Sequence, residues 1–215
     1  MHSTRAGFTL IELLVVIGIL SMLVVTFAPD IIGAWSTANQ AADAQNMRQV
    51  YSWIENDYKR KIKHYPFEGG HKFVLAPWVD GIIEKTPKNF DRFFNPALTK
   101  SNSHYHELRA SEDLEHIWPD FQSVSSLDTD YAGRAKEAMK GSIDSGKEAW
   151  MADDNEDGWA FKDGTINILY GDGTVRTLVA KDLKDRFGWT EITREHVFPT
   201  YGPDSPHEDL RKLEK

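Results

Sequence analysis

The chain has 215 residues, of which 40% are hydrophobic and 12% aromatic; this is enough apolar material for a packed core and excludes general disorder. Its formal net charge is −8, so it lacks the basic footprint that a nucleic-acid partner requires. It contains no cysteine, which excludes a disulfide framework, thiol catalysis and zinc sites built on cysteine.

The first predicted element is an apolar segment from Phe8 to Ala28, which follows a short polar start containing Arg5. Its 21 residues are long enough to span a bilayer as a helix, at about 1.5 Å per residue. Arg5 on the short flank predicts that this end stays in the cytoplasm. Glu12 does not fit a plain span, because a carboxylate in hydrocarbon costs about 2.5–3.5 kcal/mol on insertion scales. Such a residue is expected to have a partner or a role.

Two ordinary interpretations leave part of this segment unexplained. A cleavable signal peptide has an apolar region of about 7–15 residues followed by a small-x-small cleavage site. Here the run is longer, and the residues before Pro29 offer only a poor site. An unprocessed membrane anchor explains the length and the charge of the flank, but it does not explain Glu12.

The stretch GFTLIELLVVI, from Gly7 to Ile17, resembles the class III signal of type IV pilins and type II secretion pseudopilins. The resemblance implies that residues 1–7 are a leader peptide, which prepilin peptidase removes by cutting between Gly7 and Phe8. It implies that Phe8 is then N-methylated and that Glu12 is the family's marker glutamate. It also implies a single-pass protein of the bacterial inner membrane with a periplasmic head, which assembles with other pilin or pseudopilin subunits.

The resemblance also suggests a partner for the Glu12 carboxylate. Cleavage creates a new α-amino group on Phe8, and in a filament the Glu12 carboxylate of one subunit could pair with the Phe8 amine of its neighbour. Pairing compensates a buried charge, and removing one partner is strongly destabilising. Loss of the leader also removes Arg5, so the mature formal charge becomes 24 − 33 = −9.

A helical pattern resumes after Pro29. Apolar residues recur at spacings of 3, 1, 3, 4 and 4, which predicts one buried face of an amphipathic helix; they are Met47, Val50, Tyr51, Ile54, Tyr58 and Ile62. Asn46 and the other intervening polar residues are expected to face water. We therefore predict one long helix over 8–63, with 8–28 in the membrane and the second half packed on a globular head. Pro and a Gly pair within 64–70 end it.

The remainder is predicted to be an α+β head over 64–200, followed by a flexible tail at 201–215 that is rich in proline and charge. Within the head, the apolar run at 71–83 is compatible with a short strand. The stretch 111–118 begins like a capped helix, and a short helix is expected around 130–140.

The clearest element of the head is a β-hairpin. Thr165–Tyr170 and Thr174–Val179 are rich in β-formers, and the Asp172-Gly173 pair between them is a strong turn signal. The segment resembles the carboxy-terminal hairpin of pilin-like proteins with an H-x9-DG signature. It departs from that signature at Lys162, where the pattern has histidine.

The sequence DDNEDG at 153–158 fits the first half of a calcium loop. Oxygen ligands at alternating positions converge on one cation, and the glycine permits the sharp turn. The expected ligands are Asp153, Asn155 and Asp157. Position twelve is Gly164, where an EF-hand has a bidentate glutamate, so a solvated acidic turn is the alternative.

No other motif predicts chemistry. The spacing of His104, His106 and His116 could suggest zinc, but no closing ligands follow at a recognisable spacing, and surface or half-buried histidines are the expectation. The sequence has no nucleophile elbow, P-loop or dinucleotide fingerprint. The resemblance to pilins and pseudopilins implies a structural, non-enzymatic filament subunit. The alternative is a membrane-tethered binding module that does not polymerise.

Overall fold

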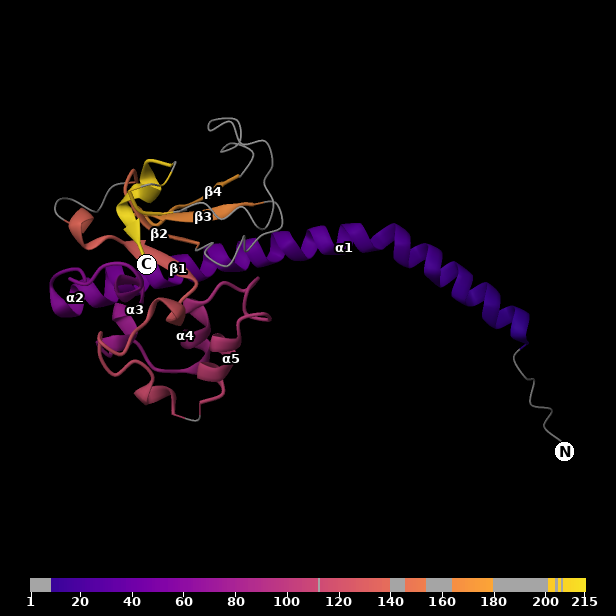
Figure 1. The fold of residues 1–215 in the computed structure, drawn as a ribbon, viewed down its shortest axis with the longest axis horizontal. Helices are drawn as coiled ribbons and strands as arrows, with labels where there is room; N and C mark the ends of the chain where they lie inside the picture. The colour runs from indigo at the N-terminus through magenta and orange to yellow at the C-terminus, as the bar shows by residue number, and fades with distance from the viewer. Residues whose placement is uncertain are drawn as a thin grey trace. The chain divides into compact units, whose positions relative to one another are not determined.

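The computed structural model describes residues 9–111, 113–139, 146–153, 164–179, 201–203, 205 and 207–215. The chain divides into two units, residues 1–38 and residues 39–215, the second of which is the head. The expected α+β architecture is confirmed: a long apolar amino-terminal helix is followed by a head that contains a five-stranded antiparallel sheet (Figure 1).

The predicted long helix is confirmed over its described residues. Helix α1 spans Leu10–Ser52, and the helical path continues through a π-helical turn at Trp53–Tyr58 into α2, Lys59–Ile62. Pro29 lies inside α1 without ending it. The helix ends where Lys63 adopts a left-handed backbone conformation with φ of 72°.

In the head, the buried face of this helix is formed by the apolar residues that the sequence predicts. Met47, Val50, Ile54 and Tyr58 are at most 4% exposed. Asn46 was expected to face water, and this prediction is wrong. It is 5% exposed, its Nδ2 donates to the Phe94 carbonyl at 3.1 Å, and its Oδ1 accepts from Arg92 at 2.6 Å. An amide can be buried at this position because both ends find partners.

Three short helices follow: α3 at His71–Val79, α4 at Pro87–Phe90 and α5 at Ser103–Arg109. Helix α3 replaces the strand expected at 71–83. Its residues from Phe73 to Trp78 are all buried, and a short run that is apolar throughout fits a buried strand and a buried helix equally well. Pro77 disfavours a central strand, because proline cannot donate to the ladder. The helix expected at 111–118 is only a 3-10 turn, Leu114–His116.

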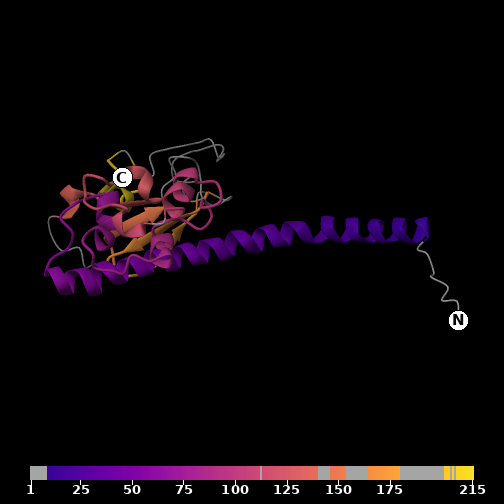
Figure 2. The same ribbon diagram turned by 90° about the horizontal axis from the view of Figure 1, so that it is seen from below.

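The sheet has the order β4-β3-β2-β1-β5, with every neighbouring pair antiparallel. Its strands are β1 (Tyr131–Arg134), β2 (Ala149–Asp153), β3 (Ile166–Tyr170), β4 (Val175–Leu178) and β5 (Leu213–Glu214). Figure 2 shows the last turns of α1 running along the head beside these strands. The predicted hairpin is confirmed as β3 and β4, in which Leu169 is opposite Val175.

Strand β1 lies where a helix was expected, around 130–140. All four of its residues are buried, so the strand shows no alternation in the sequence. A Cβ on Gly133 would collide with the Gly70 carbonyl oxygen and would lie 2.9 Å from Val74 Cγ2. Glycine therefore lets the start of α3 approach the sheet closely. In the described part of this stretch, which ends at residue 139, the helical residues are Lys136–Met139, which form a 3-10 turn.

The carboxy-terminal residues differ from the predicted flexible tail. Leu213–Glu214 pair with β1, the 3-10 turn Asp209–Lys212 precedes them, and Leu210 and Leu213 are fully buried. Composition alone predicts a loose tail here, whereas the core accommodates these two leucines.

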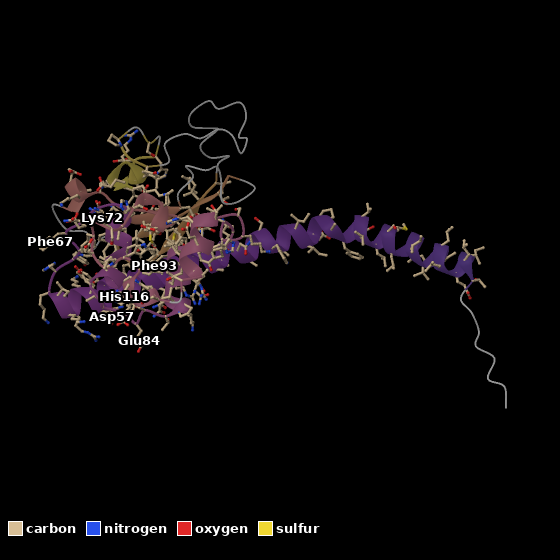
Figure 3. All side chains as sticks on the ribbon, turned by 60° about the horizontal axis from the view of Figure 1, so that its bottom comes forward. Asp57, Phe67, Lys72, Glu84, Phe93 and His116 are labelled. Atoms are coloured by element: carbon tan, nitrogen blue, oxygen red, sulfur yellow. The ribbon has the colours of Figure 1, made fainter. Side chains whose placement is uncertain are left out.

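The head core is dominated by aromatic side chains around Trp78, Phe93, Trp118 and Trp150. Phe93 lies inside the head, whereas Asp57 and Glu84 lie at its outside (Figure 3). A second, smaller cluster of buried side chains joins the sheet to Leu210 and Leu213.

Candidate functional site in the amino-terminal segment

The amino-terminal unit carries the residue that the sequence singles out. Helix α1 begins at Leu10, which places Thr9 at the N-cap and Glu12 in the first turn. Glu12 Oε2 accepts from the Thr9 backbone N–H at 2.8 Å and from the Thr9 hydroxyl at 2.7 Å. The Glu12 backbone N–H donates in return to Thr9 Oγ1 at 3.3 Å. Thr9 and Glu12 therefore form a reciprocal capping box.

Thr9 is a capping residue that the sequence interpretation missed, although its signal is visible. The pattern T-x-x-E before an apolar run is typical of a helix start. The capping box supplies donors to the Glu12 carboxylate within its own chain, and the positive end of the helix dipole favours the negative charge there. Both bonds use Oε2; Glu12 Oε1 accepts no hydrogen bond from the residues that the structure describes.

The segment that follows is uncharged from Leu13 to Pro29, between Glu12 and Asp30. At about 1.5 Å per residue, these 17 residues cover about 26 Å, close to the hydrocarbon thickness of a bilayer. One helix in the described part of the chain, Leu10–Ile62, is long and apolar enough to span a membrane. The apolar part of this helix is not buried by the rest of the described residues.

The apolar side chains of this unit point outward on all sides of the helix (Figure 3). Seventeen large apolar residues between Leu10 and Trp35 are 44–81% exposed. The two hydroxyl residues within the span bond to the helix itself: Ser21 donates to the Ile17 carbonyl at 2.7 Å and Thr26 to the Met22 carbonyl at 2.8 Å. Internal satisfaction of this kind is what hydrocarbon requires.

The other predicted processing residues, Gly7 and Phe8, lie outside the described residues. So do Asn155 and Asp157, two of the three predicted calcium ligands, and Lys162, the position at which the H-x9-DG signature is broken.

Asp153, the third predicted calcium ligand, ends β2 and is 2% exposed. Its Oδ1 accepts from Asn95 Nδ2 at 2.8 Å and its Oδ2 from the Asn167 backbone N–H at 2.8 Å. Both oxygens are thus engaged inside the head, and no group of three metal-ligating side chains occurs among the described residues. The rest of the predicted loop lies outside the described residues, so the calcium assignment with Asp153, Asn155 and Asp157 as ligands stays a prediction.

Asp153 belongs to a buried polar network that joins α1 to the sheet. Asp43, on α1, accepts from the Tyr131 hydroxyl at 2.7 Å and from Asn167 Nδ2 at 2.7 Å. Asn167 also donates to the Gln40 carbonyl at 3.2 Å. Asp43 lies four residues before Met47 and seven before Val50, on the apolar stripe of the helix. A carboxylate at a core position of that stripe was the signal that could have revealed the network.

The network continues through a third carboxylate. Asp130, which is 9% exposed, accepts from the Asn95 backbone N–H at 3.0 Å and from Asn102 Nδ2 at 3.1 Å. Asn95 therefore bridges Asp130 and Asp153. These contacts link the segment between α4 and α5 to the strands, and they are internal to the head.

The histidines considered for zinc have other contacts. His104 Nε2 lies 2.8 Å from Asp128 Oδ1, and His116 Nδ1 lies 2.6 Å from Asp113 Oδ2. His106 packs edge-on against the ring of Tyr105. These pairs do not bring the three histidines to a shared centre.

The Asp-Gly turn of the hairpin is held by hydrogen bonds within the turn and by a contact with α1. Asp172 Oδ1 accepts from the Thr174 backbone N–H at 2.9 Å and from its hydroxyl at 2.6 Å. Gly173 has a φ of 78°, which favours glycine, and its α-carbon faces the ring of Tyr51. The Tyr51 hydroxyl donates to the Gly171 carbonyl at 3.1 Å. The turn is therefore a docking point between the sheet and α1.

Comparison with known families gives a match on the amino-terminal segment. Residues 2–28 match the model of the prokaryotic N-terminal methylation motif. No curated protein and no solved structure matches the chain. The chain therefore carries a prepilin-type signal, in the same segment in which Glu12 caps the exposed apolar helix.

Proposed function

We propose that this protein is a structural subunit of a type IV pilus-like filament or of a type II secretion pseudopilus. In this proposal, prepilin peptidase cuts between Gly7 and Phe8, and the new terminus is N-methylated. The single observation that carries the proposal is the methylation motif at residues 2–28, which coincides with an uncovered apolar helix.

The exposed apolar helix supports assembly because of its surface. Contiguous apolar surface of this extent does not stay in water, so lipid must cover it before assembly and other helices must cover it afterwards. The span fits a single-pass inner-membrane protein with its head in the periplasm, and Arg5 fits a cytoplasmic amino terminus. The partners are then other pilin or pseudopilin subunits.

The capping box sharpens the proposed role of Glu12. Thr9 engages Oε2, while Oε1 can accept from the Phe8 amine of a neighbouring subunit. One carboxylate would then accept hydrogen bonds from Thr9 at the start of its own helix and also compensate the positive charge of the Phe8 amine in the next chain. Two functions on one side chain explain why a costly residue is placed at the end of the span.

Substitutions at Glu12 and Thr9 separate these two functions. Glu12→Ala and Glu12→Gln are expected to insert into the membrane and to be cleaved, but to be lost from the sheared filament fraction, because both remove the negative charge. Thr9→Ala removes the local cap and leaves the carboxylate, so it is expected to cost only about 1 kcal/mol of helix stability and to retain incorporation.

The measurements are immunoblots of the membrane and filament fractions and the mass of the processed chain. Incorporation of Glu12→Gln at the wild-type level would remove the pairing argument. Equal loss in Thr9→Ala and Glu12→Ala would assign Glu12 to capping alone.

The alternative is a tethered binding module that never polymerises. Such a module would be absent from the filament fraction both with Glu12 and with Glu12 replaced. Calcium binding by Asp153, Asn155 and Asp157 is a separate proposal. It predicts that added Ca²⁺ raises the unfolding temperature of the wild-type chain and not that of Asp157→Asn.

A further inference from the structure

Two opposite charges on the long helix have no partner among the residues that the structure describes. The charged side chains between Leu10 and Tyr58 are Glu12, Asp30, Asp43, Arg48, Glu55 and Asp57. Asp30 and Arg48 are exposed, and neither forms a hydrogen bond or an ion pair with a described residue. One negative and one positive charge are therefore available to a partner outside the chain.

The other four charges bond within their own chain. The pairs are Glu12 with Thr9, Asp43 with Tyr131 and Asn167, Glu55 with Lys59, and Asp57 with Arg60. Asp43 is also fully buried in the head, so a second copy of the chain cannot reach it. By elimination, Asp30 and Arg48 are the charges of this helix that a second copy would meet without a partner of their own in the described part of the chain.

Asp30 and Arg48 cannot compensate each other within one chain. Both lie on α1, and the 18 residues between them cover about 27 Å of helix. An ion pair requires its charged atoms to approach within about 4 Å. The two charges can meet only if they belong to two different copies.

Assembly of the proposed filament would cover Asp30. Its apolar neighbours along the helix, Phe27, Ile31 and Ile32, are 53–57% exposed, and other helices must cover them in a bundle. A carboxylate that is covered together with them is costly unless a cation pairs with it.

The sequence leaves one cation close to this part of the helix. Arg5 is lost with the leader, and the Phe8 amine is the proposed partner of Glu12. The next Lys or Arg along the chain is Arg48. Its planar guanidinium can bind a carboxylate through two parallel hydrogen bonds, which suits a covered pair.

The helix surface beside Asp30 has room for a long side chain. Residues three and four positions along a helix are surface neighbours, and here they are Gly33 and Ala34. A Cβ on Gly33 would have no neighbour within 4 Å. An arginine from a second copy can therefore approach Asp30 over these two small residues.

We propose that Asp30 of one copy pairs with Arg48 of a second copy in the assembled filament. This inference rests on the proposed function, because it requires copies to assemble. With parallel helices, the pair sets an axial offset of about 27 Å between the two copies. Pairing of Glu12 with the Phe8 amine sets an offset of only about 6 Å, so the two ion pairs join different copies. Each contact joins unlike positions, as an open helical assembly requires.

Charge exchange tests the pair. Asp30→Arg and Arg48→Asp each place like charges opposite each other, so each single variant is expected to fall at least about tenfold in the sheared filament fraction. The double variant restores opposite charges and is expected to return to near the wild-type level. Asp57→Asn is the matched control, because the arginine that Asp57 contacts lies in its own chain at 3.3 Å. It should incorporate like the wild type.

Cross-linking tests the offset without touching either charge, and it decides the matter if Asp30→Arg disturbs membrane insertion. The chain has no cysteine, so introduced thiols report only on themselves. Ala34→Cys and Ser52→Cys lie four residues beyond Asp30 and Arg48 and have the same separation. In filaments, this double variant should give a ladder of linked copies with a short thiol-specific cross-linker, whereas either single variant can give at most dimers. Ala34→Cys with Gln45→Cys, about 10 Å out of register, should give no ladder.

The outcomes separate the ion pair from the proposed function. Incorporation of both single charge variants at the wild-type level would overturn the pair, while wild-type chain in the filament fraction would still support the function. Loss of the double charge variant together with absence of the ladder would also overturn the pair, because the two charges would then have other partners. Absence of the wild-type chain from filaments would contradict the function and the pair together.

Discussion

The carboxylates of Glu12 and Asp153 find their hydrogen-bond partners in different ways, one locally and one through the fold. Glu12 could be recognised from the sequence because it interrupts an apolar run, and its partner Thr9 could be found three residues away by the capping-box pattern. The partners of Asp153 could not be found in this way. They are Asn95 and Asn167, and only the folded head brings them to the end of β2.

Leu213 is the residue that most clearly contradicts the predicted flexible tail. Its side chain is 0% exposed, so Leu213→Ala should lower the free energy of unfolding by about 2–5 kcal/mol through lost apolar burial and a new cavity. Leu127, which is 57% exposed, provides the control, and Leu127→Ala should change stability by no more than about 0.5 kcal/mol. Denaturant unfolding of the full chain in detergent measures both. An equal change in the free energy of unfolding for the two variants would support the predicted flexible tail at 201–215.

At the scale of elements, the sequence predicts what is determined locally. The long helix is marked by apolar periodicity, and the β3–β4 hairpin by Asp172-Gly173 between two β-rich runs. Strand β1 and helix α3 were assigned to the wrong class. Both are buried on every side, so neither shows the alternation or the periodicity that separates strands from helices. The partner of β1 on one side, β5, is about 80 residues away along the chain.

The contact between α3 and β1 depends on the absence of a side chain at Gly133. In Gly133→Ala, the new Cβ would meet the Gly70 carbonyl and the Val74 side chain, both of which are held by packed elements. We expect the free energy of unfolding to fall by at least 1–3 kcal/mol, on the order found for overpacked cores. Gly33 has no neighbour within 4 Å, so Gly33→Ala should be neutral or slightly stabilising. Thermal unfolding compares the two, and a neutral Gly133→Ala would show that α3 can shift.

For the whole molecule, two properties need a common explanation. The head is acidic, internally bonded and built on an aromatic core, which suits an independent extracytoplasmic domain. The amino-terminal unit exposes a continuous apolar surface. A filament subunit that passes from the bilayer into a bundle of helices accounts for both properties, because each environment covers the apolar surface while the head stays in water.

The central claim is that this chain enters a filament through cleavage before Phe8. Mass spectrometry of the native protein, isolated from its membrane and filament fractions, tests it most directly. The account predicts a chain that has lost residues 1–7 and begins with N-methylated Phe8. A chain that begins at Met1, or one cut after Ala28 as a signal peptide would be, would contradict it.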